Sequence, residues 1–150
     1  MARQKNALRG HFIAPVTDPK TEPDKSAYKE LAKWIEDVDD DTDEATTSVA
    51  YYDGDGTEET TVTSVKGSYT FKGTYDNADE AMALIAGLKY KLGNDRLVWH
   101  KVVDSDGKNQ HVGIATVSAI KAGSGAAANY EEFSCKISYN SIPKTTAVVG

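Results

Sequence analysis

Apolar and polar side chains alternate along much of this chain, which is the pattern of strands that bury one face. The clearest run is 65–75. Its odd positions are Val65, Gly67, Tyr69, Phe71, Gly73 and Tyr75, and its even positions are Lys66, Ser68, Thr70, Lys72 and Thr74. We expect the apolar odd positions to pack on the core and the even positions to lie on the other face.

Shorter runs of apolar, aromatic and β-branched residues predict more strands. They fall at about 10–16, 30–36, 46–52, 96–103, 110–122 and 130–139. The stretch 28–38 also fits one face of a helix, and we favour the strand. Turn-forming residues at 53–56, 104–109 and 123–125 separate the runs and predict reversals of the chain.

One stretch, 77–92, has helical spacing instead. Its apolar positions Ala81, Ile85, Leu88 and Leu92 recur every three or four residues. Asn77 is the expected N-cap, with Glu80 completing a capping box, and Gly93 is expected to end the helix. About seven strands and one helix predict a mainly β fold, a β-sandwich or flattened barrel with the helix on one side.

The length and composition predict a single domain covering 1–150. With 150 residues, 39% of them hydrophobic, the chain can bury one core. Residues 1–9 are expected to form a mobile arm and 140–150 a tail. A lone cysteine excludes an internal disulfide, and no apolar run is long enough to cross a bilayer.

Acidic residues gather in the middle of the chain. Between Trp34 and Val65 there are 11 aspartates and glutamates and no lysine or arginine, whereas the remainder carries 12 acidic and 17 basic residues. The segment 36–59 is therefore either a solvated acidic loop or a surface that meets a basic surface of another copy. The candidate assembly residues in it are Asp39, Asp40, Asp41, Asp43, Glu44, Asp53, Asp55, Glu58 and Glu59.

Few residues suggest chemistry. His100 and His111 flank the turn at 104–109, where Asp104 or Asp106 could complete a metal site, but ordinary strand residues explain them better. Cys135 falls on the apolar phase of its strand and is expected in the core. The aspartates at 37–41 lack the glycine and glutamate of a calcium loop. We therefore expect no catalytic residue, no metal and no cofactor, and we do not expect an enzyme.

Several segments in order resemble the major tail proteins of long-tailed, non-contractile phages of Gram-positive bacteria. They are Trp34-Ile35 with the acidic run, 51–57, 69–76, the capped helix, Arg96 with Trp99, 113–118 and 133–143. The resemblance spans about 10–143. It does not extend to the carboxy-terminal immunoglobulin-like domain that some relatives carry. It implies a β-sandwich subunit with one flanking helix, in hexameric rings whose inner sheets join into a continuous barrel.

The resemblance also implies a role and partners. The rings would stack into a tail tube around the tape-measure protein, between a tail terminator and distal tail proteins, and would pass DNA without binding it specifically. The subunit would be found in the virion tail, and in the host cytoplasm during assembly, with no membrane partner.

The alternation at 65–75 suggests which face such a tube would use. With the odd phase in the core, Lys66, Ser68, Thr70, Lys72 and Thr74 would face the channel or a ring contact. Carboxylates of the acidic segment would then offset the two lysines, since an adhesive wall would hold DNA.

Two alternatives stay open. One is a tube subunit of a contractile tail or type VI-like secretion system. The other is a monomeric carbohydrate-binding module with Tyr51, Tyr52 and Trp99 as its aromatic cluster.

Overall fold

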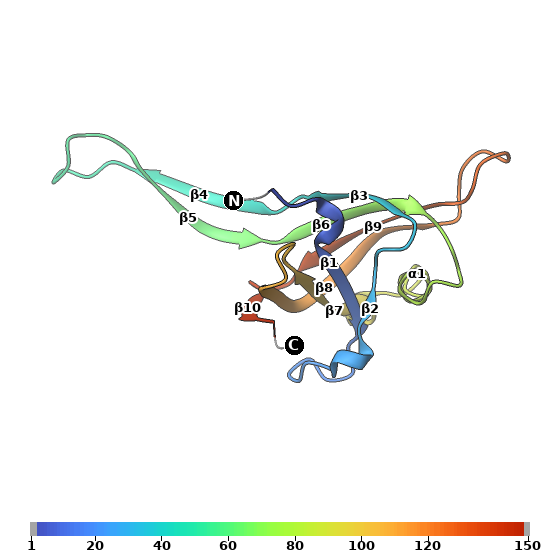
Figure 1. Cartoon of the computed structure of the whole chain (residues 1–150). Coiled ribbons are helices and arrows are strands. Elements are labelled where there is room, and N and C mark those ends of the chain that lie inside the picture. The colour runs from blue at the N-terminus through green and yellow to red at the C-terminus, as the bar shows by residue number, and fades with distance from the viewer. Residues whose placement is uncertain (1–2, 149–150) are drawn as a thin grey trace.

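The computed structural model describes residues 3–148, which fold around one curled antiparallel sheet (Figure 1). Its strands run in the order β2-β1-β7-β8-β9-β6-β3, and β10 also pairs with β8. The bounds are β1 Gly10–Pro15, β2 Lys29–Glu30, β3 Ile35–Asp40, β6 Ser68–Thr74, β7 Leu97–Val103, β8 Asn109–Ala122, β9 Glu132–Tyr139 and β10 Lys144–Ala147. A separate hairpin consists of β4 Asp43–Val49 and β5 Glu59–Lys66. This confirms the predicted mainly β fold.

The long strand β8 holds the sheet together. Along one edge it pairs with β7, from Leu97 opposite Thr116 to Val103 opposite Gln110. Along the other edge β10 pairs with its first part and β9 with its second part, so β9 and β10 follow one another along the same edge. The predicted carboxy-terminal tail, 140–150, therefore contains a paired strand.

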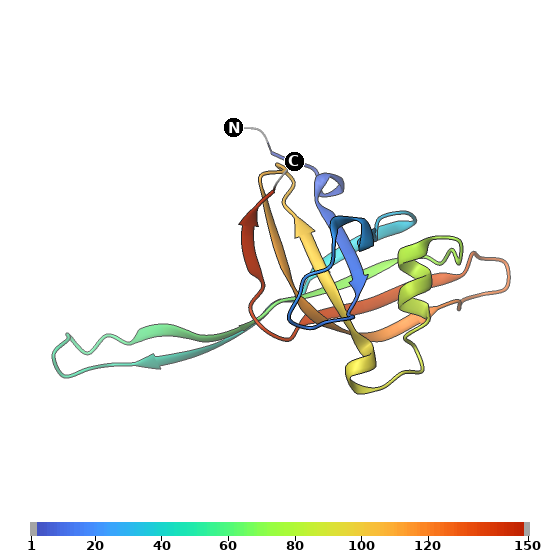
Figure 2. The same cartoon turned by 90° about the horizontal axis from the view of Figure 1, so that it is seen from below.

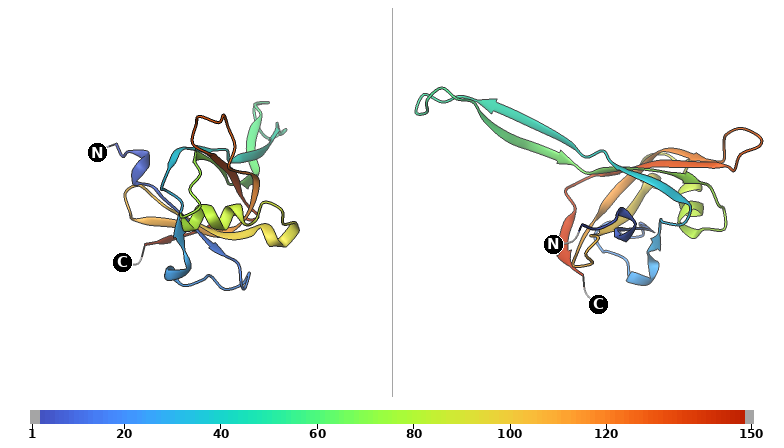
Figure 3. Two further views of the ribbon diagram at one scale, coloured as in Figure 1. Left: turned by 90° about the vertical axis from the view of Figure 1, so that its right-hand side faces the viewer. Right: turned by 45° about the horizontal axis from the view of Figure 1, so that its top comes forward.

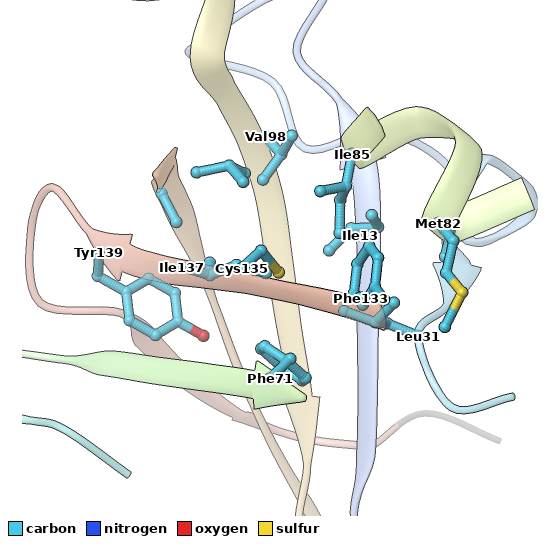
Figure 4. Packing of buried hydrophobic residues seen from close by; sticks show 13 residues of the cluster. Ile13, Leu31, Phe71, Met82, Ile85, Val98, Phe133, Cys135, Ile137 and Tyr139 are labelled. Carbon is cyan, nitrogen blue, oxygen red and sulfur yellow. The ribbon is translucent and has the colours of Figure 1, made fainter. Parts of the chain in front are cut away.

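The core lies between the inner face of the curled sheet and the helix α1 Glu80–Ala86 (Figure 4). Phe71, Phe133 and Ile137 come from the sheet, and Met82 and Ile85 from the helix, all fully or almost fully buried. Burying each of these side chains stabilises the fold by about 1.5 to 3 kcal/mol.

The predicted odd phase of 65–75 packs on the core from position 69 onward. Phe71 is buried, and Tyr69 and Tyr75 pack against the core cluster. Val65 is 40% exposed, because the predicted single strand breaks at Gly67 and the part before it belongs to the hairpin.

The helix is shorter than predicted. Its N-cap is Asp79, whose carboxylate accepts a hydrogen bond from the Met82 amide at 3.3 Å, and not Asn77. It ends at Ala86, and Gly93 opens a 3-10 helix, η3 Gly93–Arg96, instead of closing α1. Beyond Ala86, the amides of Leu88, Lys89 and Lys91 donate to carbonyl oxygens three residues back, so the chain continues in tight turns and not as an α-helix.

Much of the acidic segment 36–59, predicted as a loop, forms strands, and 50–58 connects two of them. Ile35–Asp40 pairs with β6, and Asp43–Val49 forms one side of a hairpin that projects far from the sheet (Figures 1 and 2). The predicted strand at 30–36 is interrupted by Trp34, which has a positive φ of 66°. Two further 3-10 helices, η1 Asn6–Leu8 and η2 Lys25–Ala27, precede it.

The ends of two predictions fall outside the described residues. These are positions 1–2 of the predicted mobile arm and positions 149–150 of the predicted tail. Within 3–148, no helix has both the length and the apolar character needed to span a membrane.

Candidate functional site: a polar sheet face and an extended arm

The outer face of the sheet, which points away from α1 and the core, is polar over four neighbouring strands. Along each strand the residues on this face alternate with buried ones such as Phe71, Cys135 and Val117. We call it the polar face. Its residues are Asp37, Asp39, Ser68, Thr70, Lys72, Thr74, Thr116, Ser118, Lys121, Glu132, Ser134, Lys136 and Ser138. Hydroxyl groups dominate it, and its few charges have both signs.

The strand register places carboxylates beside the lysines of this face. Asp37 lies opposite Lys72, and Asp39 lies opposite Thr70, which is in turn opposite Lys136. Residues directly opposite one another in a sheet have their Cβ atoms about 4.5 to 5.5 Å apart. The Thr70 hydroxyl also donates a hydrogen bond to Asp41. Acidic residues therefore line the polar face along its β3 edge.

The five residues predicted to face a channel or a ring contact do not all lie on this face. Thr70, Lys72 and Thr74 lie on the polar face with accessible side chains. Ser68 is on the same face but is only 3% exposed, with its hydroxyl 3.1 Å from that of Ser138. Lys66 ends β5, opposite Asp43, and so belongs to the hairpin.

Sequence reasoning missed most of this face. The alternation of Ser134, Lys136 and Ser138 was visible, but nothing in the sequence showed that their strand pairs with β6 on one side and β8 on the other. Thr116 and Ser118 join the face only through that pairing.

The hairpin of β4 and β5, which we call the arm, is the second candidate surface. Every residue of both strands is exposed, and the arm joins the sheet only at its base (Figure 3). Near its tip Tyr51 is 57% exposed and Tyr52 is fully exposed. Isolated two-stranded hairpins are marginally stable in water. An arm with no packed face is therefore suited to lie against another molecule.

The predicted assembly residues follow one another along this ribbon. Asp39 and Asp40 are on β3, Asp41 follows it, Asp43 and Glu44 are on β4, Asp53 and Asp55 are in the tip, and Glu58 and Glu59 are at the start of β5. Hydrogen bonds from Thr57 hold the pKa of Asp55 below its usual range. The Asp55 carboxylate is therefore charged at neutral pH.

The histidine metal site considered and disfavoured at the turn 104–109 does not form, because the two histidines face different surroundings. His100 points into the core, whereas His111 binds Asp104 at 3.2 Å and the Thr145 hydroxyl at 2.7 Å. Among residues 3–148, no three His, Cys, Asp or Glu side chains are grouped as metal ligands would be.

His100 has a different partner, His11, which the sequence did not connect to it. The two rings stack with centroids 5.5 Å apart, and Nδ1 of His11 lies 3.4 Å from Nε2 of His100. Burial, and then the nearby Arg9, lower the pKa of His11 to about 4. Burial, and then His11, lower the pKa of His100 to about 3. Both rings are neutral at pH 7.

The positions of Cys135 and of the three aromatic residues Tyr51, Tyr52 and Trp99 decide two further predictions. Cys135 is buried as predicted, and burial raises the pKa of its thiol to about 12, so it is a core residue. The aromatic cluster proposed for a carbohydrate-binding module is wrong. Trp99 is in β7, in register with Ala14 and Ile114, while Tyr51 and Tyr52 are near the tip of the arm.

The fold has counterparts among solved structures. A chain from the tail of an empty gene transfer agent particle, refined helically with C6 symmetry, aligns at a TM-score of 0.68 and 12% identity, covering 97% of this chain and 100% of that one. A chain from the virion of a native gene transfer agent aligns at 0.67 with the same identity and coverage. At this identity the likeness establishes a shared fold.

A third alignment is weaker. It is to a chain of a sheath-tube complex of an extracellular contractile injection system, with 10% identity, and its TM-score of 0.49 adds no support. No protein-family profile matches the sequence, and no curated protein matches it.

Proposed function

We propose that this chain is the subunit of a phage-type tail tube, in which rings of copies stack around a channel that passes DNA. The observation that carries the proposal is the polar face. Four adjacent strands present hydroxyls and balanced charges on one side and a packed core on the other. A water-filled channel needs such a wall, since an apolar face would instead bury itself against a partner.

The sheet edges beside the polar face support closure into a ring. Within residues 3–148, no strand pairs with the outer edge of β3, and none pairs with 117–122 of β8 on the side that β7 leaves free. The two free edges lie on opposite sides of the polar face, so edge-to-edge pairing of copies would continue it around a barrel. The sixfold symmetry of the gene transfer agent tail, which has this fold, supports six copies in a ring.

The arm suits the stacking of such rings. It is acidic, exposed on all sides and projects beyond the sheet, so it would gain packing only against a neighbouring copy. Contacts between unlike surfaces can repeat without limit, as a tube requires.

The charge of the polar face fits passage of DNA. Three carboxylates and three lysines lie on it, so a ring would present a wall with no net charge. DNA binds tightly where lysines and arginines neutralise phosphates and release counterions, and on this wall carboxylates balance the lysines.

We also propose a non-contractile tail of a phage of Gram-positive bacteria. Its partners would be the tape-measure, tail terminator and distal tail proteins, and the chain would have no enzymatic activity.

Electron microscopy of the purified protein over a concentration series tests the proposal. It should show rings and hollow, regularly striated tubes above a threshold concentration, with free subunits below it. Discrete particles without a channel at every concentration would contradict the proposal.

A further inference from the structure

A second exposed feature lies at the other end of the molecule from the arm tip. It is the turn after α1, Lys89 to Leu92, which we call the knob. Tyr90 is 89% exposed and Leu92 is 83% exposed, and Lys91 is exposed beside them. The Lys89 ammonium lies 5.6 Å from the centre of the Tyr90 ring. An aromatic and an aliphatic side chain are thus presented to solvent between two positive charges.

The knob is fixed by Arg96 although its side chains are free. The guanidinium donates hydrogen bonds to the carbonyl oxygens of Lys89 at 2.6 Å and Lys91 at 2.8 Å, and to that of Val117 on β8 at 3.3 Å. The Lys91 amide also donates to the carbonyl oxygen of Leu88. Such bracing prepares a surface for binding, because little backbone entropy is lost when a partner arrives.

The chemistry of the knob matches that of the arm tip. The tip presents Tyr51 and Tyr52 next to Asp53 and Asp55, whereas the knob presents Tyr90 and Leu92 next to two lysines. Each surface has exposed apolar side chains and charges of the opposite sign to the other. The arm extends to one side of the sheet and the knob lies on the other, so an arm cannot reach the knob of its own chain (Figure 2).

We propose that the knob receives the arm tip of a second copy of this chain. Lys89 and Lys91 pair with Asp53 and Asp55, and Tyr90 and Leu92 pack against the tyrosines of the tip. The inference builds on the proposed function, since it assigns the contact that the arm would make when rings stack.

A charge-reversal experiment tests it. The variant Lys89→Glu with Lys91→Glu should raise the concentration needed for assembly at least tenfold without changing the thermal unfolding midpoint. The matched control, Lys20→Glu with Lys108→Glu, changes the net charge equally at exposed lysines elsewhere and should assemble as the wild type does. Adding Asp53→Lys and Asp55→Lys to the knob variant should restore assembly.

The outcomes separate the two proposals. If the wild type forms tubes and the knob variant forms them equally well, the knob contact is wrong and the tube proposal stands. If the wild type forms other oligomers that the knob variant loses and the double reversal restores, the contact stands and the tube is wrong. If the knob variant fails to assemble and adding Asp53→Lys and Asp55→Lys does not restore assembly, the proposed pairing of the knob with the arm tip is wrong. A wild type that stays monomeric at every concentration would contradict both.

Discussion

At the scale of single residues, the stacked pair of His11 and His100 is the most unusual feature of the core. Tyr69, Phe71 and Tyr139 surround the two rings, and Nδ1 of His100 is buried without a hydrogen-bond partner. A charge on either ring would be costly there. The folded chain therefore holds both histidines neutral, whereas the unfolded chain lets them titrate near pH 6.5.

This difference predicts acid sensitivity of known sign. Both folded-state pKa values are depressed, so between pH 6.5 and about 4 the unfolded chain binds protons that the folded chain does not. Stability is fully present above pH 6.5 and falls as the pH drops. Between pH 7 and pH 5 each histidine should lower the free energy of unfolding by about 2 kcal/mol.

The variant His11→Phe isolates the effect from the carboxylates. Chemical unfolding at the two pH values should show the wild type losing about 2 kcal/mol more than the variant. Equal losses would show that His11 is not held neutral by the fold.

Alternation predicts the burial of single residues but not their partners. Cys135 was placed in the core because its strand alternates regularly. His11 and His100 are 89 positions apart and meet only because β1 pairs with β7. No local pattern contains that information.

At the scale of elements, α1 shows where helical spacing misleads. Leu88 and Leu92 continue the apolar phase of Ala81 and Ile85, but the chain leaves the helix at Gly87, and Leu92 reaches solvent. Hydrogen bonds from Arg96, a residue beyond the predicted helix, hold the turn that replaces its last part, and helical spacing carries no sign of them.

Two substitutions test which residues of this stretch hold the helix on the sheet. Ile85→Ala should lower the free energy of unfolding by about 2 to 5 kcal/mol, because it removes buried methyl groups and leaves a cavity. Leu92→Ala should change it by less than about 0.5 kcal/mol, as for other surface positions. Similar effects in thermal or chemical denaturation would contradict the observed end of the helix.

The arm shows the opposite case, in which the elements were foreseen and their placement was not. Threonines and valines predicted a strand near 46–52, and glycines and aspartates predicted the turn after it. Neither strand of the arm has a buried side chain, so its sequence carries no signal of a packed face. The sequence pattern therefore does not distinguish a strand of a projecting hairpin from a strand of the main sheet.

At the scale of the whole molecule, the polar face exists only through the order of the strands. Each of its four strands has one polar phase, but that phase becomes a continuous surface only when β3, β6, β9 and β8 lie side by side. The sequence predicted that acidic residues would offset the lysines. The register places Asp37 opposite Lys72, whereas Lys66, the other lysine of that prediction, lies on the arm opposite Asp43, so the offset itself stays a prediction.

If the polar face lines a tube as proposed, reversing the charges of its acidic edge should make that wall adhesive to DNA. Asp37→Lys with Asp39→Lys would turn a face with balanced charges into a basic one, and the assembled variant should then retain DNA in co-sedimentation, with binding that weakens steeply as salt is raised. The control, Asp24→Lys with Glu30→Lys, changes the net charge equally away from the face and should retain far less DNA. Equal retention by both variants would show that the face does not meet DNA.

The most direct measurement is a reconstruction of the assembled particle by cryo-electron microscopy at a resolution that separates the strands. The proposal predicts that β3, β6, β9 and β8 of each copy line a central channel, with Thr70, Lys72, Ser134 and Lys136 facing it and α1 on the outer side. An assembly with α1 toward the axis, or with the polar face buried or on the outside, would contradict it.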